Sequence, residues 1–117
     1  MDVKFRADIS STTRIPFTIQ DLVNPVPLLS IQQLVIPWLQ AGHKPVVYAG
    51  YKDKYGKEIY EGDTVAYFIY DKEYQRGIVT YGAFAAEIYI CYGWFVADEE
   101  GEQLSEAGLE PDAWQVI

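Results

Sequence analysis

The sequence predicts a mainly β fold with one short helix, in which the strands form a small barrel or a rolled antiparallel sheet. Short runs suited to strands recur about every 8–12 residues between turn residues, which is typical of such folds. Aromatic residues make up 15% of the 117 residues, and Tyr, Trp and Phe favour pleated, half-buried surfaces. This length fits a single domain, 1–117, with N-terminal strands and a helix in 1–42 and a β core in 43–117.

The N-terminal segment predicts two strands. Lys4–Ser10 alternates apolar and polar residues, so that Phe5, Ala7 and Ile9 share one face. Arg14–Ile19 follows as a second strand that contains Pro16. Because proline cannot donate a hydrogen bond to a neighbouring strand, Pro16 indicates an edge strand or a bulge.

The segment 30–42 carries the helix signal. Ser30 is a suitable N-cap, and Gln33 three residues later completes a capping box. Gly42 suits the position after the last turn. Apolar residues recur at helical spacing, namely Ile31, Leu34, Val35, Trp38 and Leu39. We expect a helix over 31–41 that is kinked at Pro37, with the alternative of a strand ending at Ile36 and a turn that opens with Pro37.

Beyond Gly42 the pattern indicates strands almost throughout. Gly56 marks the turn over 52–56, and the polar run 71–76 predicts a hairpin loop. The expected strands are 45–49, 64–70, 77–81, 85–92, 94–97 and 113–117. The expected core residues are Val47, Ile59, Val65, Tyr67, Val79, Ile88, Ile90 and Trp94.

Charge is distributed unevenly along the chain, whose net charge is −8. Residues 1–57 carry seven basic and four acidic side chains, whereas residues 58–117 carry two basic and thirteen acidic ones. Seven acids fall in the stretch 98–112: Asp98, Glu99, Glu100, Glu102, Glu106, Glu110 and Asp112. They form either a solvated loop or an acidic surface that meets a basic partner or imitates nucleic-acid phosphates. Their spacing does not follow that of a calcium-binding loop.

The segment 51–57 interleaves lysines with tyrosines. Lys52, Lys54 and Lys57 alternate with ring surfaces on which bases of single-stranded nucleic acid stack. A turn between two strands has the same composition for structural reasons, and the net charge of −8 argues against binding dominated by phosphate contacts. The candidate interaction residues are therefore Lys52, Lys54, Lys57, Asp98, Glu99, Glu100 and Glu102.

Catalytic, cofactor-binding and metal-binding residues are not predicted, and we expect that the protein is not an enzyme. Cys91 lies in a strand-like run, and His43 lies in a turn-like stretch. The alternative of an enzyme rests on the paired acids Glu58, Glu61 and Asp63. A single cysteine and the absence of a long apolar run favour a cytoplasmic protein without a membrane segment.

The segment Tyr48–Val65 resembles the signature of the YopX-like family of phage and prophage proteins. The matching residues are Gly50, Lys52, Asp53, Gly56, Glu58, Ile59, Tyr60, Glu61, Gly62, Asp63 and Val65. Tyr55 stands where the family usually has Asn. The segments 4–7 and 114–117 are similar to the family's opening and last strand, although Asp8 replaces a usual Trp. The resemblance implies an SH3-like barrel fold and a location in a bacterial host cell. It implies no activity.

The motif itself is interpreted as structural. Gly56 and Gly62 are the turn points, and the Asp63 carboxylate accepts backbone N–H groups at its turn. Tyr60 and Glu61 are expected to cover the mouth of the barrel. Ile59 and Val65 enter the core.

The expected function is a non-enzymatic protein-interaction module with a protein partner, for which the acidic stretch suggests a basic one. Two alternatives stay open. One is a nucleic-acid-binding barrel that uses Lys52–Lys57, and the other is an acidic inhibitor or mimic directed at a host defence or nucleic-acid enzyme. Self-association through the edge strand near Arg14–Ile19 is a further expectation.

Overall fold

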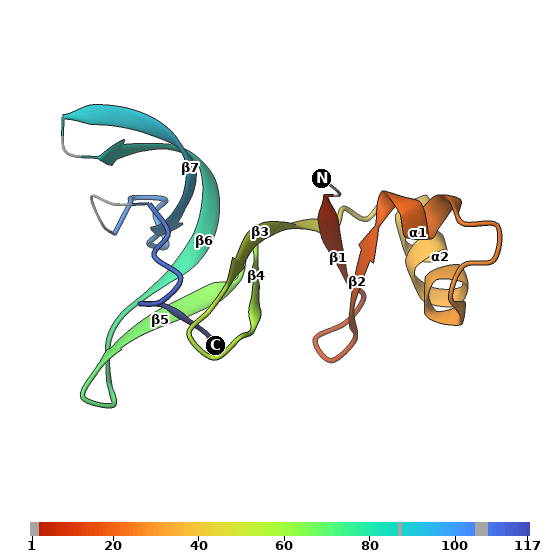
Figure 1. The fold of residues 1–117 in the computed structure, drawn as a ribbon, viewed down its shortest axis with the longest axis horizontal. Helices are drawn as coiled ribbons and strands as arrows, with labels where there is room; N and C mark the ends of the chain where they lie inside the picture. Colours follow the sequence, from red (N-terminus) through yellow and green to blue (C-terminus); the bar gives the residue numbers. More distant parts are fainter. Residues whose placement is uncertain (1–2, 87, 105–107) are drawn as a thin grey trace. The chain divides into compact units, whose positions relative to one another are not determined.

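The computed structural model describes residues 3–86, 88–104 and 108–117. The fold is mainly β, with 48% of residues in strands and 15% in helices, which confirms the predicted class. Two four-stranded antiparallel sheets have the strand orders β2-β1-β3-β4 and β7-β6-β5-β8 (Figure 1). The chain divides into two compact units, Met1–Tyr48 and Ala49–Ile117, which are described one after the other.

The first unit is built on three strands. β1 (Lys4–Asp8) pairs with β2 (Arg14–Thr18) along its whole length, and with the start of β3 (Val46–Lys52) through Phe5 and Val47. β2 is the outer strand of the sheet, so the prediction that Pro16 lies in an edge strand is confirmed. The ladder therefore does not depend on the N–H group that proline lacks.

Helix α1 (Ile19–Val23) starts where the sequence predicted the end of a strand. Thr18 caps it, because its hydroxyl accepts the Asp21 N–H at 3.3 Å. The Asp21 carboxylate in turn accepts the Thr18 N–H at 2.8 Å. This reciprocal capping box ends β2 at Thr18 and turns Ile19 into the first helical residue.

The predicted helix over 31–41 is confirmed, and the alternative strand ending at Ile36 is wrong. A π-helical turn, η1 (Ile31–Val35), leads directly into α2 (Ile36–Gln40). Ser30 already has helical angles and makes no side-chain cap, so the predicted capping box is wrong. Pro37 lies in the first turn of α2, directly after the π-helical turn. Gly42 ends the helix with a φ of +93°, as predicted.

The core of the first unit lies between this helix and the sheet. Ala7, Phe17, Ile31 and Val35 are its buried residues. Phe5 stacks on Phe17 with ring centroids 5.6 Å apart, which extends the core across the β1–β2 pair. The helix periodicity predicted Ile31 and Val35 correctly, whereas Leu34 is exposed.

The second unit contains the end of β3, β4 (Glu58–Tyr60), β5 (Thr64–Ile69), β6 (Lys72–Ala86), β7 (Tyr89–Ala97) and β8 (Gln115–Val116). The predicted loop over 71–76 is wrong. Tyr70 and Asp71, with φ values of 49° and 64°, form the turn, and β6 begins at Lys72. Two residues with positive φ are typical of tight hairpin turns whose twist matches that of the strands.

The strands predicted at 77–81, 85–92 and 94–97 form one long hairpin instead. β6 and β7 pair without interruption from Ile78 with Ala97 to Ala86 with Tyr89. The predicted strand 85–92 therefore contains the hairpin end rather than a separate strand. Gly82 and Gly93, which lie between the predicted strands, pair with each other within this ladder.

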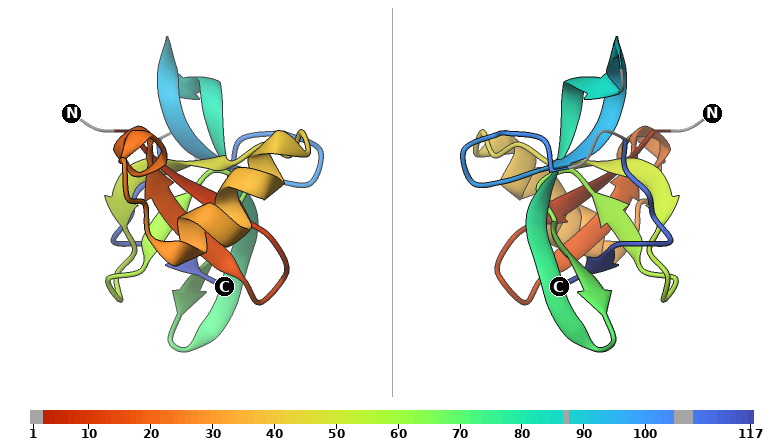
Figure 2. Two further views of the ribbon diagram at one scale, coloured as in Figure 1. Left: turned by 90° about the vertical axis from the view of Figure 1, so that its right-hand side faces the viewer. Right: turned by 90° about the vertical axis from the view of Figure 1, so that its left-hand side faces the viewer.

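The core of the second unit contains Ile59, Val65, Val79, Val96, Trp114 and Val116. Of the predicted core residues, Ile59, Val65 and Val79 are buried, while Tyr67 and Trp94 pack against the cluster. The prediction is wrong for Ile88 and Ile90, whose exposed fractions are 86% and 74%. Both belong to the far end of the β6–β7 hairpin, which projects from its unit (Figure 2).

Gly56 has a φ of +82°, which confirms the predicted turn. A β-branched residue is strained in this backbone region, so Gly56→Val is expected to destabilise the protein by about 1–2 kcal/mol. Thermal melting of both proteins checks this value. Tyr55→Val, one position earlier in the same turn, is the control, and equal midpoints for the two variants would show that the strain is absent.

Candidate interaction sites in the second unit

The Asp53 carboxylate holds the lysine-rich turn together. Its Oδ1 accepts the N–H groups of Tyr55 and Lys57, each at 2.9 Å. Its Oδ2 accepts the N–H of Val116 at 3.0 Å, so the turn is tied to β8. Burial raises the pKa of Asp53, but the three backbone hydrogen bonds and the nearby Lys57 charge outweigh this effect and lower the pKa overall.

Asp63 plays a similar part in the turn between β4 and β5. Its carboxylate accepts the Tyr60 N–H at 2.9 Å, which confirms its predicted role as an acceptor. Its backbone oxygen accepts the Val79 N–H at 2.9 Å, and the N–H of Gly62 donates to the Val79 oxygen at 2.8 Å. The turn is thereby fastened to β6.

Tyr60 is buried, and its position at the mouth of a barrel stays a prediction. Its hydroxyl donates to Glu58 Oε1 at 3.3 Å. Glu61 is exposed on the turn, next to Gly62 with a φ of +85°. The two aspartates of the motif, Asp53 and Asp63, therefore maintain the fold by accepting backbone N–H groups.

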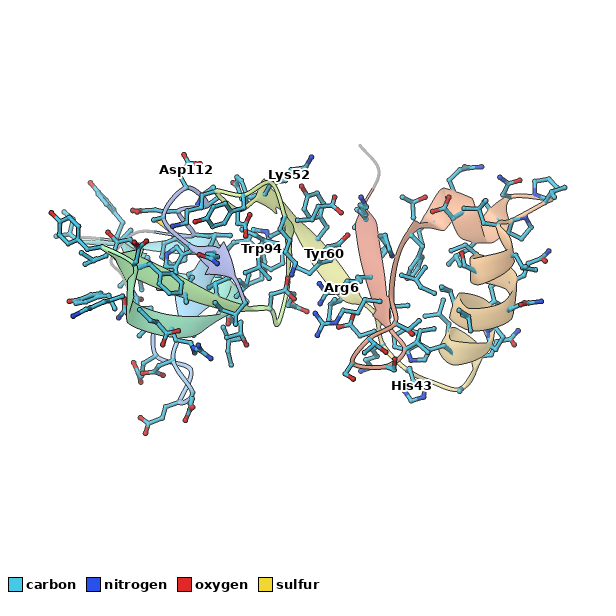
Figure 3. All side chains as sticks on the ribbon, turned by 90° about the horizontal axis from the view of Figure 1, so that it is seen from below. Arg6, His43, Lys52, Tyr60, Trp94 and Asp112 are labelled. Atoms are coloured by element: carbon cyan, nitrogen blue, oxygen red, sulfur yellow. The ribbon has the colours of Figure 1, made fainter. Side chains whose placement is uncertain are left out.

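The lysine turn presents its charges to solvent. Lys52, Lys54 and Lys57 are exposed, and the labelled Lys52 side chain in Figure 3 points outward from the second unit. The Lys54 Nζ lies 5.2 Å from the ring centroid of Tyr55 and 5.9 Å from that of Phe68. The Lys54 side chain therefore extends toward Phe68 of β5.

The acidic stretch is divided between two turns. In the first, Asp98 Oδ1 accepts the N–H groups of Glu100 and Glu102 at 2.9 Å each, so that Asp98 serves the turn. The neighbouring Glu99 is exposed, as are the two glutamates. In the second, a hydrogen bond of 3.0 Å from the Ala113 N–H to the Glu110 oxygen closes the turn over 110–113. Glu106 lies outside the described residues.

A cavity of about 690 Å³ brings the second acidic turn and the lysine turn together. Lys54 lines it from one turn, and Glu110 and Asp112 line it from the other, with Tyr67 and Phe68 of β5 between them. The sequence alone did not determine whether these two charged segments share a face. Their proximity means that an approaching phosphate would meet two carboxylates beside Lys54.

The far end of the β6–β7 hairpin, residues 81–86 and 88–94, forms a second candidate site that we call the arm (Figure 2). Tyr92 lies opposite Ala83, and Ile90 lies opposite Ala85, so these side chains share one face. The exposed large apolar residues of the arm are Tyr81, Ile88, Tyr89, Ile90 and Tyr92. Across residues 77–97 the only charged residue in the sequence is Glu87.

The arm is held in place at its edge. The Gln103 side-chain amide accepts the Ala85 N–H at 2.6 Å and donates to the Ala85 oxygen at 2.7 Å, as a neighbouring strand would. Phe84 stacks near Phe95 with centroids 5.6 Å apart, and Tyr81 meets Trp94 edge to face at 5.1 Å. The apolar face is therefore supported from within the unit and open on its outer side.

Sequence reasoning missed the arm because it placed Ile88 and Ile90 in the core. The sequence did contain a signal for the arm. Residues 77–97 form a long run with a single charged residue, and this run is apolar on both faces of its strands. Cys91 is half-buried in this hairpin. In the first unit, the His43 ring stacks on Trp38 at 5.3 Å.

Within residues 3–86, 88–104 and 108–117, no three His, Cys, Asp or Glu side chains are grouped so that they hold a metal ion. Among the same described residues, no helix has the length and apolar character needed to cross a membrane.

A protein-family model matches most of the chain. The family model described as YopX protein matches residues 37–117, which is more than two thirds of the chain. The match includes the whole of the second unit and both candidate sites. No curated protein and no solved structure matches the chain.

Proposed function

Because the chain belongs to the YopX protein family, for which the resemblance implies no activity, we propose its function from the surfaces of the second unit. It is a non-enzymatic protein-interaction module that serves a phage or prophage inside the bacterial host cell. In neither sheet does the strand order close on itself. The SH3-like barrel that the resemblance implies therefore stays a prediction.

The arm is the observation that carries this proposal. Five large apolar residues expose more than half of their surface on one short hairpin. Contiguous exposed apolar patches mark protein-binding surfaces, and tyrosine is enriched there because its ring is apolar and its hydroxyl stays hydrated. Three of the five residues are tyrosines. A protein partner that covers the arm removes this apolar surface from water.

The geometry of the acids favours a binding protein over an enzyme. Paired acid catalysis by Glu58, Glu61 and Asp63 needs a carboxylate that is free to exchange protons with a substrate. The Asp63 side chain is 5% exposed and accepts a backbone N–H. Its carboxylate holds the turn, which supports a structural role.

A nucleic-acid-binding barrel is less favoured than a protein-binding module. Glu110 and Asp112 line the same cavity as Lys54, and they repel phosphate groups. The acidic-mimic alternative is weakened because the Asp98 carboxylate already accepts two backbone N–H groups. The acids that remain most accessible are Glu99, Glu100, Glu102, Glu110 and Asp112.

The double variant Ile90→Ser with Tyr92→Ser is expected to abolish partner binding without lowering the melting temperature by more than a few degrees. Both side chains are exposed, at 74% and 79%, so their loss removes apolar contact area from the complex rather than from the core. The measurement is affinity capture from the bacterial host, together with light scattering of the purified chain at micromolar concentration. Light scattering of the purified chain shows whether the partner is a second copy of this chain.

The matched control for the arm is Tyr55→Ser, which removes a tyrosine that is 71% exposed in the lysine turn. It is expected to keep both the captured partner and the state of association of the wild type. Equal capture and equal association for the wild type and the arm variant would contradict the proposal. Capture of nucleic acid that is lost with Lys52→Ala and Lys54→Ala would favour the nucleic-acid alternative instead.

A further inference from the structure

A small cavity of about 190 Å³ lies at the other end of β6 and is walled by three aromatic rings. The rings belong to Tyr67 of β5, Tyr74 of β6 and Trp114, which directly precedes β8. Gln75, Glu110 and Ala113 complete the wall. We call this site the aromatic cage. It differs from the arm in position and in chemistry.

A β-bulge places Tyr74 in the cage. Tyr67 pairs with Gln75, and Phe68 pairs with Glu73, so Tyr74 is an extra residue in β6. In a regular strand, Tyr74 and Gln75 would point to opposite faces. The bulge redirects Tyr74 so that it lines the same cavity as Gln75 and Tyr67.

The short strand β8 supplies the third ring. Val116 pairs with Val65 and Gln115 pairs with Ala66, and the Trp114 ring just before this ladder lies beside that of Tyr67. Trp114 is 5% exposed and belongs to the hydrophobic core. The inner wall of the cage is therefore fixed by core packing before any ligand arrives, which reduces the entropy lost on binding.

Tyr67 meets Tyr74 edge to face, and its ring is tilted against that of Trp114. The centroids of Tyr67 and Tyr74 are 6.1 Å apart with an interplanar angle of 75°. Those of Tyr67 and Trp114 are 5.9 Å apart with an angle of 55°. The electron-rich face of each ring attracts a cation within about 6 Å of its centroid, and Trp and Tyr are the strongest such partners.

Charge near the cage also favours a cation. The exposed Glu110 carboxylate lines both the cage and the adjoining larger cavity, where Asp112 lies as well. The labelled Asp112 side chain points outward from the unit in Figure 3. Lys54 is the opposing group, since it lines the larger cavity and holds its Nζ 5.9 Å from the Phe68 centroid.

We propose that the aromatic cage binds the ammonium group of a lysine side chain on a partner protein. The compact ammonium suits rings that meet at large angles, whereas the planar guanidinium of arginine stacks flat on a single ring. Glu110 supplies the counter-charge at the rim. The acidic character of the second unit, with fourteen acidic and five basic residues, favours the approach of a basic segment.

Titration of the full chain with small capped amino acids, followed by NMR, tests the cage. The probe is Nα-acetyl-lysine N-methylamide, and the reporter is the indole N–H signal of Trp114. The lysine probe is expected to shift this signal in a saturable manner at millimolar concentration. The neutral Nε-acetylated probe is expected to leave it in place, and the arginine probe is expected to bind more weakly.

Two variants identify the groups responsible. Tyr74→Leu and Glu110→Gln are each expected to weaken binding of the lysine probe by at least about threefold. Both side chains are exposed, so the folded spectrum is retained. Tyr55→Leu is the control and is expected to bind as the wild type does.

Lys54→Met is expected to tighten binding, because it removes the positive charge beside the cage. Equal shifts with the lysine probe and its neutral acetylated form would overturn the proposal, as would wild-type binding by both Tyr74→Leu and Glu110→Gln. Equal binding of the arginine probe would overturn the assignment to lysine. The arm plays no part in this titration, so its result is independent of whether the arm binds a protein.

Discussion

Replacing Asp53 by alanine is expected to lower the free energy of unfolding by about 3–5 kcal/mol. The substitution leaves three backbone N–H groups without their acceptor, those of Tyr55, Lys57 and Val116. A buried donor that loses its partner costs about 1–3 kcal/mol. The side chain is 6% exposed, so water replaces it only in part. Urea denaturation of both proteins measures the difference.

The variant Asp53→Asn distinguishes the hydrogen bonds within the turn from the hydrogen bond to Val116. If the amide oxygen faces Tyr55 and Lys57, its NH₂ group faces the N–H of Val116, so the link to β8 is lost while the turn survives. We expect a smaller loss than for alanine. Glu61→Ala is the control, because this exposed acid of the same motif is expected to change stability by about 0.5 kcal/mol or less. A loss of that size for Asp53→Ala would contradict the structural role of the carboxylate.

The stability that Asp53 provides depends on pH. Its pKa is lowered in the folded protein, so its contribution is complete above the unfolded value of about 3.9 and is lost as the pH falls through the folded pKa. The difference in stability between wild type and Asp53→Asn should therefore be constant above about pH 5 and should shrink under acidic conditions. A difference that grows as the pH falls below about 4 would have the wrong sign for a lowered pKa.

Gly77→Ala is expected to destabilise the second unit by about 3 kcal/mol. A Cβ atom at this position would lie 2.4 Å from Val96 Cγ1, 2.6 Å from Leu104 Cδ1 and 2.7 Å from the backbone oxygen of Ala97. The side chains have little room to move because Val96 is buried in the core, and the Ala97 oxygen belongs to a paired strand. Thermal melting measures the loss.

Gly93→Ala is the matched control for this clash. Gly93 lies in the same hairpin, and its added Cβ would meet Phe84 Cε1 at 3.7 Å, an ordinary contact distance. Its effect on stability is expected to be below about 1 kcal/mol. If the two alanine variants melted at the same temperature, the close packing of Val96, Ala97 and Leu104 around Gly77 would be wrong.

The sequence by itself determined the local structure and the family. Alternation in 4–10 and the apolar run in 64–70 placed strands there, Pro16 identified an edge strand, and Gly56 and Gly62 marked turns that have positive φ. The motif at 48–65 indicated the family whose model matches residues 37–117. These features are local, because backbone angles and the period of a strand depend on residues that are close in the chain.

Only the tertiary structure decided which faces are covered and which distant residues meet. The period of two showed that Ile90 and Tyr92 share a face, but it did not show that this face is left open beyond the core. The bond from Val116 to Asp53 spans 63 positions, and the cavity that joins Lys54 to Glu110 spans a similar distance. The bulge at Tyr74 depends on the register between two strands, which is set by cross-strand packing rather than by local sequence pattern.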